Sequence, residues 1–341
     1  MQSLICCLEN GCTRVILSTI AAPPEQVRQA INYVKEYKDS RRYLSDVLFG
    51  IMIEGSFIKE TANGGAHNPE YFSAPGKDIL KKFIDSNEYI IKIVNIPPEW
   101  GEVSYDAYKI LKEKSIISAV GHTAANADEV GRAISLGMKL GIHLFNGPSF
   151  SSYKPFNSGG TVEALLKSDE VFVEIITDGF HVDKSYFMDA VKRKGIDKII
   201  GITDNMFVTG HEIKDEFIMG NKTGVVSNDK KYLYIKDNPV ALFGSNLNMK
   251  DAFENVLNWF TSDIEGVWNK LHEADTFENA LQNSSKLFSA NPAKLLNISH
   301  ETGLLEKEKK ADIIIADIQY NKKYSIQIDK IIVKGNILDP D

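Results

Sequence analysis

Short apolar runs rich in Ile, Val and Leu recur along the chain, and between them the apolar residues recur every three to four positions. The first pattern is typical of buried strands and the second of amphipathic helices. The predicted strands are Val15–Thr19, Val47–Phe57, Tyr89–Ile96, Ile116–Thr123, Leu140–Asn146, Val171–His181 and Lys198–Met206. The predicted helices are Pro24–Tyr37, Ile79–Ser86, Tyr105–Lys114, Ala125–Met138, Thr161–Lys167 and Lys184–Lys194.

Regular alternation of strands and helices predicts a parallel sheet with right-handed crossovers. It favours an α/β fold of the TIM type, a (β/α)8 barrel, over an open sheet. No G-x-G-x-x-G motif follows an early strand, which argues against a dinucleotide-binding fold. The seven strands are one fewer than a complete barrel has. Because Ser3–Leu8 resembles the end of a helix leading into the strand at Val15, we expect the first barrel strand to be missing.

The alternation stops after Met206. Short strands are predicted at Phe217–Met219, Lys222–Val226, Lys231–Ile235 and Val240–Phe243, a β excursion over about residues 211–245. Further helices are predicted at Met249–Phe260, Trp268–Leu271, Thr276–Leu287 and Asn291–Leu296, and further strands at Ala311–Ala316 and Gln327–Val333. We expect a barrel domain over residues 1–300 and a separate C-terminal β segment over residues 301–341.

Two histidines 21 residues apart, His122 and His143, each follow an apolar strand. A strand–helix–strand connection brings both to the C-terminal ends of neighbouring strands, where barrel enzymes place their active sites. Two imidazoles there indicate a metal site. A single buried histidine is more often an ordinary core residue, so this interpretation depends on the pair.

Other polar residues also end predicted strands. Glu54 would need a cation partner if it is buried, and with His122 and His143 it makes the open three-ligand set of catalytic zinc. His181 and Asp204 end the last two strands. An aspartate in that place can act as a general base beside a metal, or it can simply cap the following turn.

Composition narrows the choice of function. Hydrophobic residues make up 43% of the 341, enough for a large core, and the net charge of −7 without a basic stripe argues against nucleic-acid binding. The sequence has neither a transmembrane run of ~18 apolar residues nor a signal peptide, so we expect no membrane association and a cytoplasmic location. The cysteines Cys6, Cys7 and Cys12 match no common zinc spacing or disulfide framework.

The strand-end motifs resemble those of N-acetylglucosamine-6-phosphate deacetylases, a family of the amidohydrolase superfamily. In order they are Ile53-Glu54-Gly55-Ser56-Phe57, Gly65-Ala66-His67-Asn68-Pro69-Glu70-Tyr71, Gly121-His122-Thr123, His143-Leu144-Phe145-Asn146, Asp178-Gly179-Phe180-His181, Thr203-Asp204 and Gly244-Ser245-Asn246-Leu247-Asn248-Met249. The resemblance covers roughly residues 11–335.

The resemblance implies a role for each matching residue. The metal ligands would be Glu54, His122 and His143, and the catalytic residues would be Asp204 as proton shuttle and His67, which polarises the acetyl carbonyl. The residues that bind the substrate would be Asn146, Gly147 and His181 for the sugar phosphate, and Leu247 and Met249 for the acetamide.

The sequence departs from the family at several points. The family begins with a β-sandwich segment and a first barrel strand, so residues 301–341 would be a remnant of that sandwich, and a second metal site is not supported. Ser56 stands where the family usually has proline, and the residues after Asp204 are not small. The Arg-Glu-Pro-Gly after Asn146 is missing, and Lys154 is the nearest cation. Lysine holds phosphate as a point charge rather than as a bidentate fork.

The resemblance therefore implies one divalent metal ion, with zinc first and iron, cobalt or manganese also compatible with two imidazoles and a carboxylate. The implied reaction is deacetylation of N-acetylglucosamine 6-phosphate to glucosamine 6-phosphate and acetate. The implied partners are this small phosphorylated amino sugar and a second copy of the chain in a homodimer. Two alternatives stay open: the same chemistry on a different N-acylated substrate, and a truncated relative without turnover.

Overall fold

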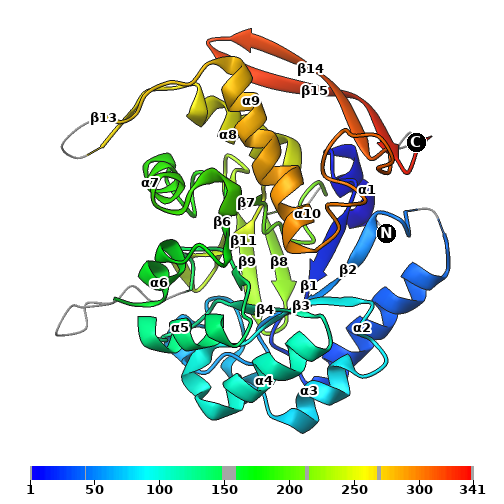
Figure 1. The fold of residues 1–341 in the computed structure, drawn as a ribbon, viewed down its shortest axis with the longest axis vertical. Coiled ribbons are helices and arrows are strands. Elements are labelled where there is room, and N and C mark those ends of the chain that lie inside the picture. Colours follow the sequence, from blue (N-terminus) through cyan, green and yellow to red (C-terminus); the bar gives the residue numbers. More distant parts are fainter. Residues whose placement is uncertain (1, 43, 148–158, 212–214, 267–269, 339–341) are drawn as a thin grey trace. The chain divides into compact units, whose positions relative to one another are not determined.

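The computed structural model describes residues 2–42, 44–147, 159–211, 215–266 and 270–338 (Figure 1). It divides into two compact units. One consists of Arg14–Val173 with Ile218–Lys222, and the other of Met1–Thr13, Glu174–Phe217 and Thr223–Asp341. The separation of a barrel domain from a C-terminal segment at residue 300 stays a proposal.

The unit that begins at Arg14 alternates strands with helices, as the sequence predicts. Its strands are β1 Val15–Ser18, β2 Leu48–Ile53, β3 Ile91–Asn95, β4 Ile117–Val120, β5 Leu140–Gly141 and the start of β6 Phe172–Ile176. Its α-helices are α2 Pro24–Asp39, α3 Lys77–Ile84, α4 Glu102–Glu113, α5 Ala127–Ser135 and α6 Thr161–Lys167. Three 3-10 turns complete it: η1 Thr61–Asn63, η2 Pro69–Tyr71 and η3 Pro98–Trp100. Each strand pairs in parallel with the next one in the chain.

Local sequence explains these elements. In β2 every residue except Phe49 is buried, as expected of a strand covered on both faces. Helix α2 begins at Pro24, and its buried residues Val27, Ile31 and Val34 recur at helical spacing. Helix α5 begins with a capping box in which the Asn126 side chain accepts from the first-turn amides and the Glu129 carboxylate accepts from the Asn126 amide.

The other unit carries the remaining elements, apart from Ile218–Lys222. Its α-helices are α1 Gln2–Glu9, α7 Lys184–Lys194, α8 Met249–Phe260, α9 Phe277–Ser285 and α10 Asn291–Leu295, with the 3-10 turn η4 Ile196–Lys198 and the π-helical turn η5 Lys286–Ala290. Strand β7 Ile199–Ile202 follows β6 in a seven-stranded sheet of order β1-β2-β3-β4-β5-β6-β7. The other sheets are β11-β10-β9-β8, from β8 Glu216–Met219, β9 Lys222–Val226, β10 Tyr232–Ile235 and β11 Asn238–Ser245; β12 Ile264–Glu265 with β13 Lys270–His272; and β14 Ile313–Asn321, β15 Lys323–Val333 and β16 Asn336–Ile337.

The structure confirms the α/β fold of the TIM type, with its parallel strands in chain order, the β excursion and the C-terminal β segment. One predicted helix is wrong. Lys270 and Leu271, placed in the helix Trp268–Leu271, belong instead to β13, which pairs antiparallel with β12. Four residues are too few for hydrophobic periodicity to distinguish a helix from a strand.

Several predicted strands are too long at their C-terminal ends. The prediction Leu140–Asn146 shrinks to the two residues of β5, because His143 and Phe145 have positive φ angles of 30° and 76°. Strands β14 and β15 are instead longer than predicted and form a hairpin that turns at Lys322. Its outer half alternates polar and apolar residues, a weaker signal than a continuous apolar run.

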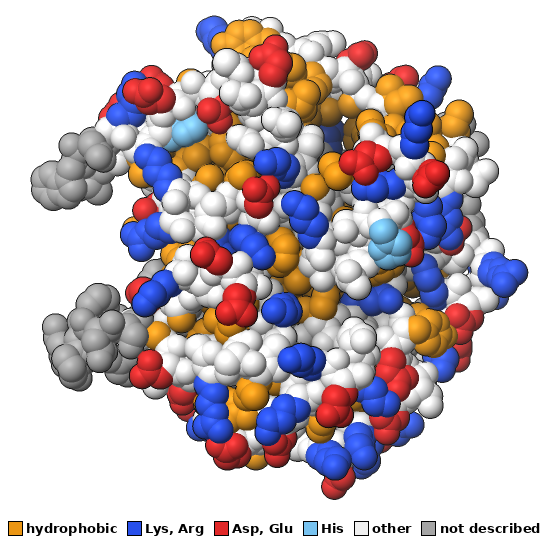
Figure 2. Space-filling view, viewed as in Figure 1, with side chains coloured by type: hydrophobic (Ala, Val, Ile, Leu, Met, Phe, Trp, Pro, Cys, Tyr) orange, Lys and Arg blue, Asp and Glu red, His pale blue; other side chains and the backbone are white. Residues whose placement is uncertain are grey.

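The surface carries charges of both signs. On the face shown in Figure 2, basic and acidic side chains are interspersed, with apolar side chains between them. Among the helices of the described residues, none combines the length and the hydrophobicity that a membrane crossing requires.

Candidate metal centre

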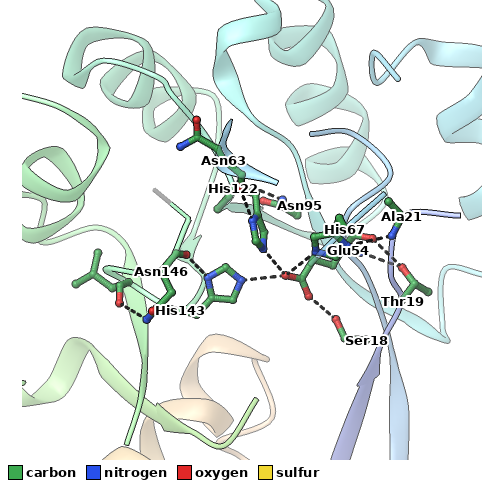
Figure 3. Close-up of polar contacts among 12 residues, drawn as sticks. Ser18, Thr19, Ala21, Glu54, Asn63, His67, Asn95, His122, His143 and Asn146 are labelled. Atoms are coloured by element: carbon green, nitrogen blue, oxygen red, sulfur yellow. Dashed lines mark hydrogen bonds and ion pairs between the residues drawn. The ribbon is translucent and has the colours of Figure 1, made fainter. Parts of the chain in front are cut away.

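The three predicted metal ligands lie together in the unit that begins at Arg14 (Figure 3). Glu54 directly follows β2, His122 lies two residues beyond β4 and His143 two residues beyond β5. The Glu54 Oε1 atom is 3.2 Å from Nε2 of His122 and 2.9 Å from Nε2 of His143. All three side chains are buried, and their candidate ligand atoms lie within 4.8 Å of one another.

In both imidazole rings, of His122 and His143, the nitrogen that points away from Glu54 makes a hydrogen bond to a backbone carbonyl. Nδ1 of His122 lies 2.7 Å from the carbonyl oxygen of Asn63, and Nδ1 of His143 lies 2.7 Å from the carbonyl oxygen of Asn146. A carbonyl oxygen can only accept, so each Nδ1 carries the hydrogen and donates it. That leaves Nε2 of each ring facing Glu54, and Nε2 is the nitrogen that would bind a metal.

The ionisation states also suit a cation. Burial lowers the pKa of His122 to about 4, although Glu54 opposes the shift, so this imidazole is neutral at pH 7. Burial alone would raise the pKa of Glu54, but hydrogen bonds from the imidazoles of His122, His143 and His67 outweigh it and hold that pKa well below the usual range. A carboxylate oxygen and two imidazole Nε2 atoms thus converge, and a divalent cation would take the place of the hydrogens between them. The donor set fits a divalent metal ion.

Residues at the end of β1 hold the Glu54 side chain and backbone. The hydroxyl of Ser18 donates to Oε2 of Glu54 at 2.7 Å, leaving Oε1 for the imidazoles. The Thr19 hydroxyl donates to the Glu54 carbonyl at 3.1 Å and accepts from the Glu54 amide at 3.0 Å. Glu54 is therefore fixed at three points, so that one carboxylate oxygen faces the proposed metal.

His67 lies beside these ligands but differs in tautomer. Its Nδ1 accepts from the backbone amide of Ala21 at 3.1 Å, so the hydrogen of the neutral ring must be on Nε2. That Nε2 is 3.8 Å from Oε1 of Glu54. His67 therefore presents an N–H donor, whereas His122 and His143 donate from Nδ1 instead. The three imidazoles divide into two candidate ligands and one hydrogen-bond donor.

Two predicted substrate-binding residues follow His143. The Asn146 side chain donates to the carbonyl of Leu144 at 3.4 Å, and its own carbonyl accepts from His143. Gly147 has a φ of +88°, and a Cβ atom there would come within 2.9 Å of Nδ1 of His122. Glycine thus allows this backbone to pass directly over a proposed metal ligand.

The other predicted site residues belong to the second unit. Nδ1 of His181 contacts the Asp178 carboxylate at 2.6 Å, which orients the ring and leaves Nε2 for a ligand. Although burial opposes it, this contact lowers the pKa of Asp178. Asp204 lies two residues beyond β7, and its carbonyl accepts from the Ser245 amide. Leu247 is buried, and Met249 is the half-buried first residue of α8. The roles of these residues stay predictions, and Lys154 lies outside the described residues.

Sequence reasoning missed four residues that contact the ligands or His67: Ser18, Thr19, Ala21 and Asn63. Ser18 and Thr19 end a predicted strand in the same manner as Glu54, so the strand-end rule could have found them. Ala21 contacts His67 through its backbone amide and Asn63 contacts His122 through its backbone carbonyl, and the sequence carries no signal for either contact.

Comparisons with known proteins agree with this geometry. The amidohydrolase family profile matches residues 255–338. N-acetylglucosamine-6-phosphate deacetylase from Vibrio furnissii is 27% identical over 333 residues, which cover 96% of this chain and 73% of the relative. The crystal structure of N-acetylglucosamine-6-phosphate deacetylase from Pasteurella multocida superimposes with a TM-score of 0.81 at 25% identity, covering 98% of this chain and 78% of the other. Over most of its length the chain is similar to N-acetylglucosamine-6-phosphate deacetylases.

The chain is also similar to relatives that are named for N-acetylgalactosamine 6-phosphate. N-acetylgalactosamine-6-phosphate deacetylase from Escherichia coli O157:H7 is 23% identical over 300 residues, covering 88% of this chain and 72% of the relative. The similarity agrees with the motifs that end the parallel strands, and with the Glu/His/His set that those strand ends bring together.

Proposed function

We propose that this protein is a metal-dependent hydrolase that removes the acetyl group of N-acetylglucosamine 6-phosphate. The observation that supports the proposal most is the division of the three imidazoles. Two imidazole Nε2 atoms and one carboxylate oxygen meet at one point, and a single N–H donor lies beside them. A metal-dependent amide hydrolase needs this combination: ligands for a Lewis acid, and a donor for the oxygen that becomes negatively charged.

A bound divalent ion supplies Lewis acidity, which acidifies a water molecule and polarises the amide carbonyl. Glu54, His122 and His143 hold that ion. The Nε2–H of His67 donates to the acetyl oxygen and stabilises its negative charge as the carbonyl carbon becomes tetrahedral. Asp204 takes the proton from the attacking water and gives it to the amine nitrogen as the C–N bond breaks. Water thus adds across the amide bond, and the products are acetate and glucosamine 6-phosphate.

The other residues position the substrate in this proposal. His181, Asn146 and Gly147 hold the sugar phosphate, together with Lys154, and Leu247 and Met249 surround the acetamide methyl group. We include zinc as the ion, a homodimer and a cytoplasmic location in the proposal, with a small phosphorylated sugar rather than nucleic acid or a membrane as the partner. Elemental analysis of purified protein and its mass in solution test the first two.

A second candidate substrate is N-acetylgalactosamine 6-phosphate, the sugar for which the Escherichia coli O157:H7 relative is named. The two sugar phosphates differ only in the configuration at C4, so the metal chemistry would be the same. Comparing kcat/KM for acetate release from each sugar phosphate, on metal-loaded protein, identifies the preferred one. A preference for the galacto sugar would keep the mechanism and change the assigned substrate.

The central test measures acetate release alongside metal content in Asp204→Asn. Positioned proton transfer contributes about 10²–10⁴ in rate, so kcat should fall by about that factor while metal content stays at the parent level. Asp317→Asn, at an exposed position on β14 in the same unit, is the matched control and should retain activity. Near-normal turnover in Asp204→Asn would place the base elsewhere. A parent protein that binds metal and releases no acetate from either sugar would support the alternative of a relative without turnover.

A further inference from the structure

Asn63, the last residue of η1, makes three hydrogen bonds around His122. Its backbone carbonyl accepts from Nδ1 of His122 at 2.7 Å. Its side-chain amide donates to the carbonyl of Thr123 at 3.1 Å and to the carbonyl of Gly147 at 2.7 Å. One residue therefore contacts the ring (Figure 3), the backbone directly after it, and the segment that follows His143.

These contacts join the two segments that carry the imidazole ligands. Thr123 is the neighbour of His122 in sequence, and Gly147 is the neighbour of Asn146, whose carbonyl accepts from His143. Two carbonyl groups cannot hydrogen-bond each other, so holding them together requires a group with two N–H donors. The amide nitrogen of an asparagine side chain is such a group.

We propose that Asn63 is a positioning residue that fixes the orientation of His122 and couples metal binding to the segment Asn146–Gly147. The inference rests on the proposed function in taking that segment as substrate-binding. The side chain of Asn63 touches neither the metal nor the reacting amide. It acts by holding the backbone around one ligand, so its removal should affect metal affinity and substrate binding together.

Two variants separate the donor function from side-chain size. Asn63→Ala removes both donors and leaves the two carbonyl groups to water. Asn63→Asp keeps the size but places a carboxylate against two carbonyl oxygens, so it should be the more damaging change. A side chain that merely filled space would show the opposite order, because aspartate matches asparagine in volume. Asn87→Ala is the matched control, since the Asn87 amide makes one local bond to the Phe83 carbonyl in the same unit.

The first measurement needs neither metal nor turnover. With histidine labelled by ¹⁵N, NMR of the metal-free protein reports the tautomer of each of the 7 histidines. We expect His122 to show one Nδ1–H tautomer with a slowly exchanging proton in the parent and in Asn87→Ala. In Asn63→Asp that proton should exchange rapidly, or the ring should populate both tautomers. An unchanged His122 signal in Asn63→Asp would overturn the inference, whatever the enzyme's activity.

The second measurement is metal affinity by chelator competition, with KM for the sugar phosphate on fully loaded protein. Loss of groups that orient metal ligands typically weakens metal binding about 10–100-fold, and we expect Asn63→Asp to fall in that range with a raised KM and a smaller change in kcat. Parent affinity in both Asn63 variants would refute the positioning role. A parent that binds metal but does not deacetylate would refute the proposed function alone, because the affinities of the variants would still test Asn63.

Discussion

Replacing Gly55 by alanine should disable His67 without replacing any side chain of the site. Gly55 has a φ of +85°, and a Cβ atom there would lie 2.4 Å from the Ala21 amide nitrogen and 2.6 Å from Nδ1 of His67. These two atoms form the 3.1 Å hydrogen bond that places the His67 hydrogen on Nε2. The added methyl group would therefore occupy the space of that bond.

The expected loss of stability has two parts. A left-handed backbone costs a residue with a Cβ atom about 1–2 kcal/mol, and a buried polar group that loses its partner costs about 1–3 kcal/mol. Together they lower the free energy of unfolding by roughly 2–5 kcal/mol. If His67 is the donor to the acetyl oxygen, kcat should also fall about 10²–10³-fold, the usual effect of removing such a donor.

Gly101→Ala separates the two parts. Gly101 has a φ of +69° at the start of α4, but a Cβ atom there would meet nothing within 4 Å. The control therefore carries backbone strain alone, and its kcat should stay at the parent level. Urea unfolding and acetate release at saturating metal are measured for both variants. If Gly55→Ala is no less stable than Gly101→Ala and turns over normally, the Ala21–His67 contact has neither the structural nor the catalytic role argued here.

Three further predictions follow from the same contacts. Ser18→Ala should weaken metal binding about tenfold, which is the lower end of the usual range because Ser18 is solvent-exposed. The control Ser56→Ala removes a buried hydroxyl without a partner and should leave metal binding unchanged. The pKa of His122 is lowered from 6.5 to about 4, so its contribution to stability is present above pH 6.5 and is lost as the pH falls toward 4. For the same reason, protons should not compete with the metal for His122 until the pH approaches 4. A tenfold loss of metal affinity per pH unit below 6.5 would contradict this prediction. Asn126→Ala removes the α5 capping box and should lower the free energy of unfolding by about 1 kcal/mol, measured by urea unfolding, with metal affinity unchanged.

The cluster of one glutamate and two histidines could be predicted because its signal is local. A buried parallel strand must be apolar, so the first polar residue after the run marks the strand end, and Glu54, His122 and His143 all follow that rule. The supporting contacts could not be predicted in the same way. The bond from Asn63 to Gly147 depends on the path of two loops, and neither residue is unusual in its own segment.

The overlong strand predictions and the metal site have one physical cause. His122, His143 and Asp204 have φ angles of 50°, 30° and 50°, a conformation that costs a residue with a Cβ atom about 1–2 kcal/mol and that also ends a strand. Sequence patterns register the apolar run and the polar residue but not the reversal of φ between them, so the predicted strands run on through these positions. Glycine or asparagine would fit the same backbone with less strain. Folding alone therefore gives little reason for two histidines there, whereas metal binding would, since outliers of this kind gather where a side chain must be held for binding or catalysis.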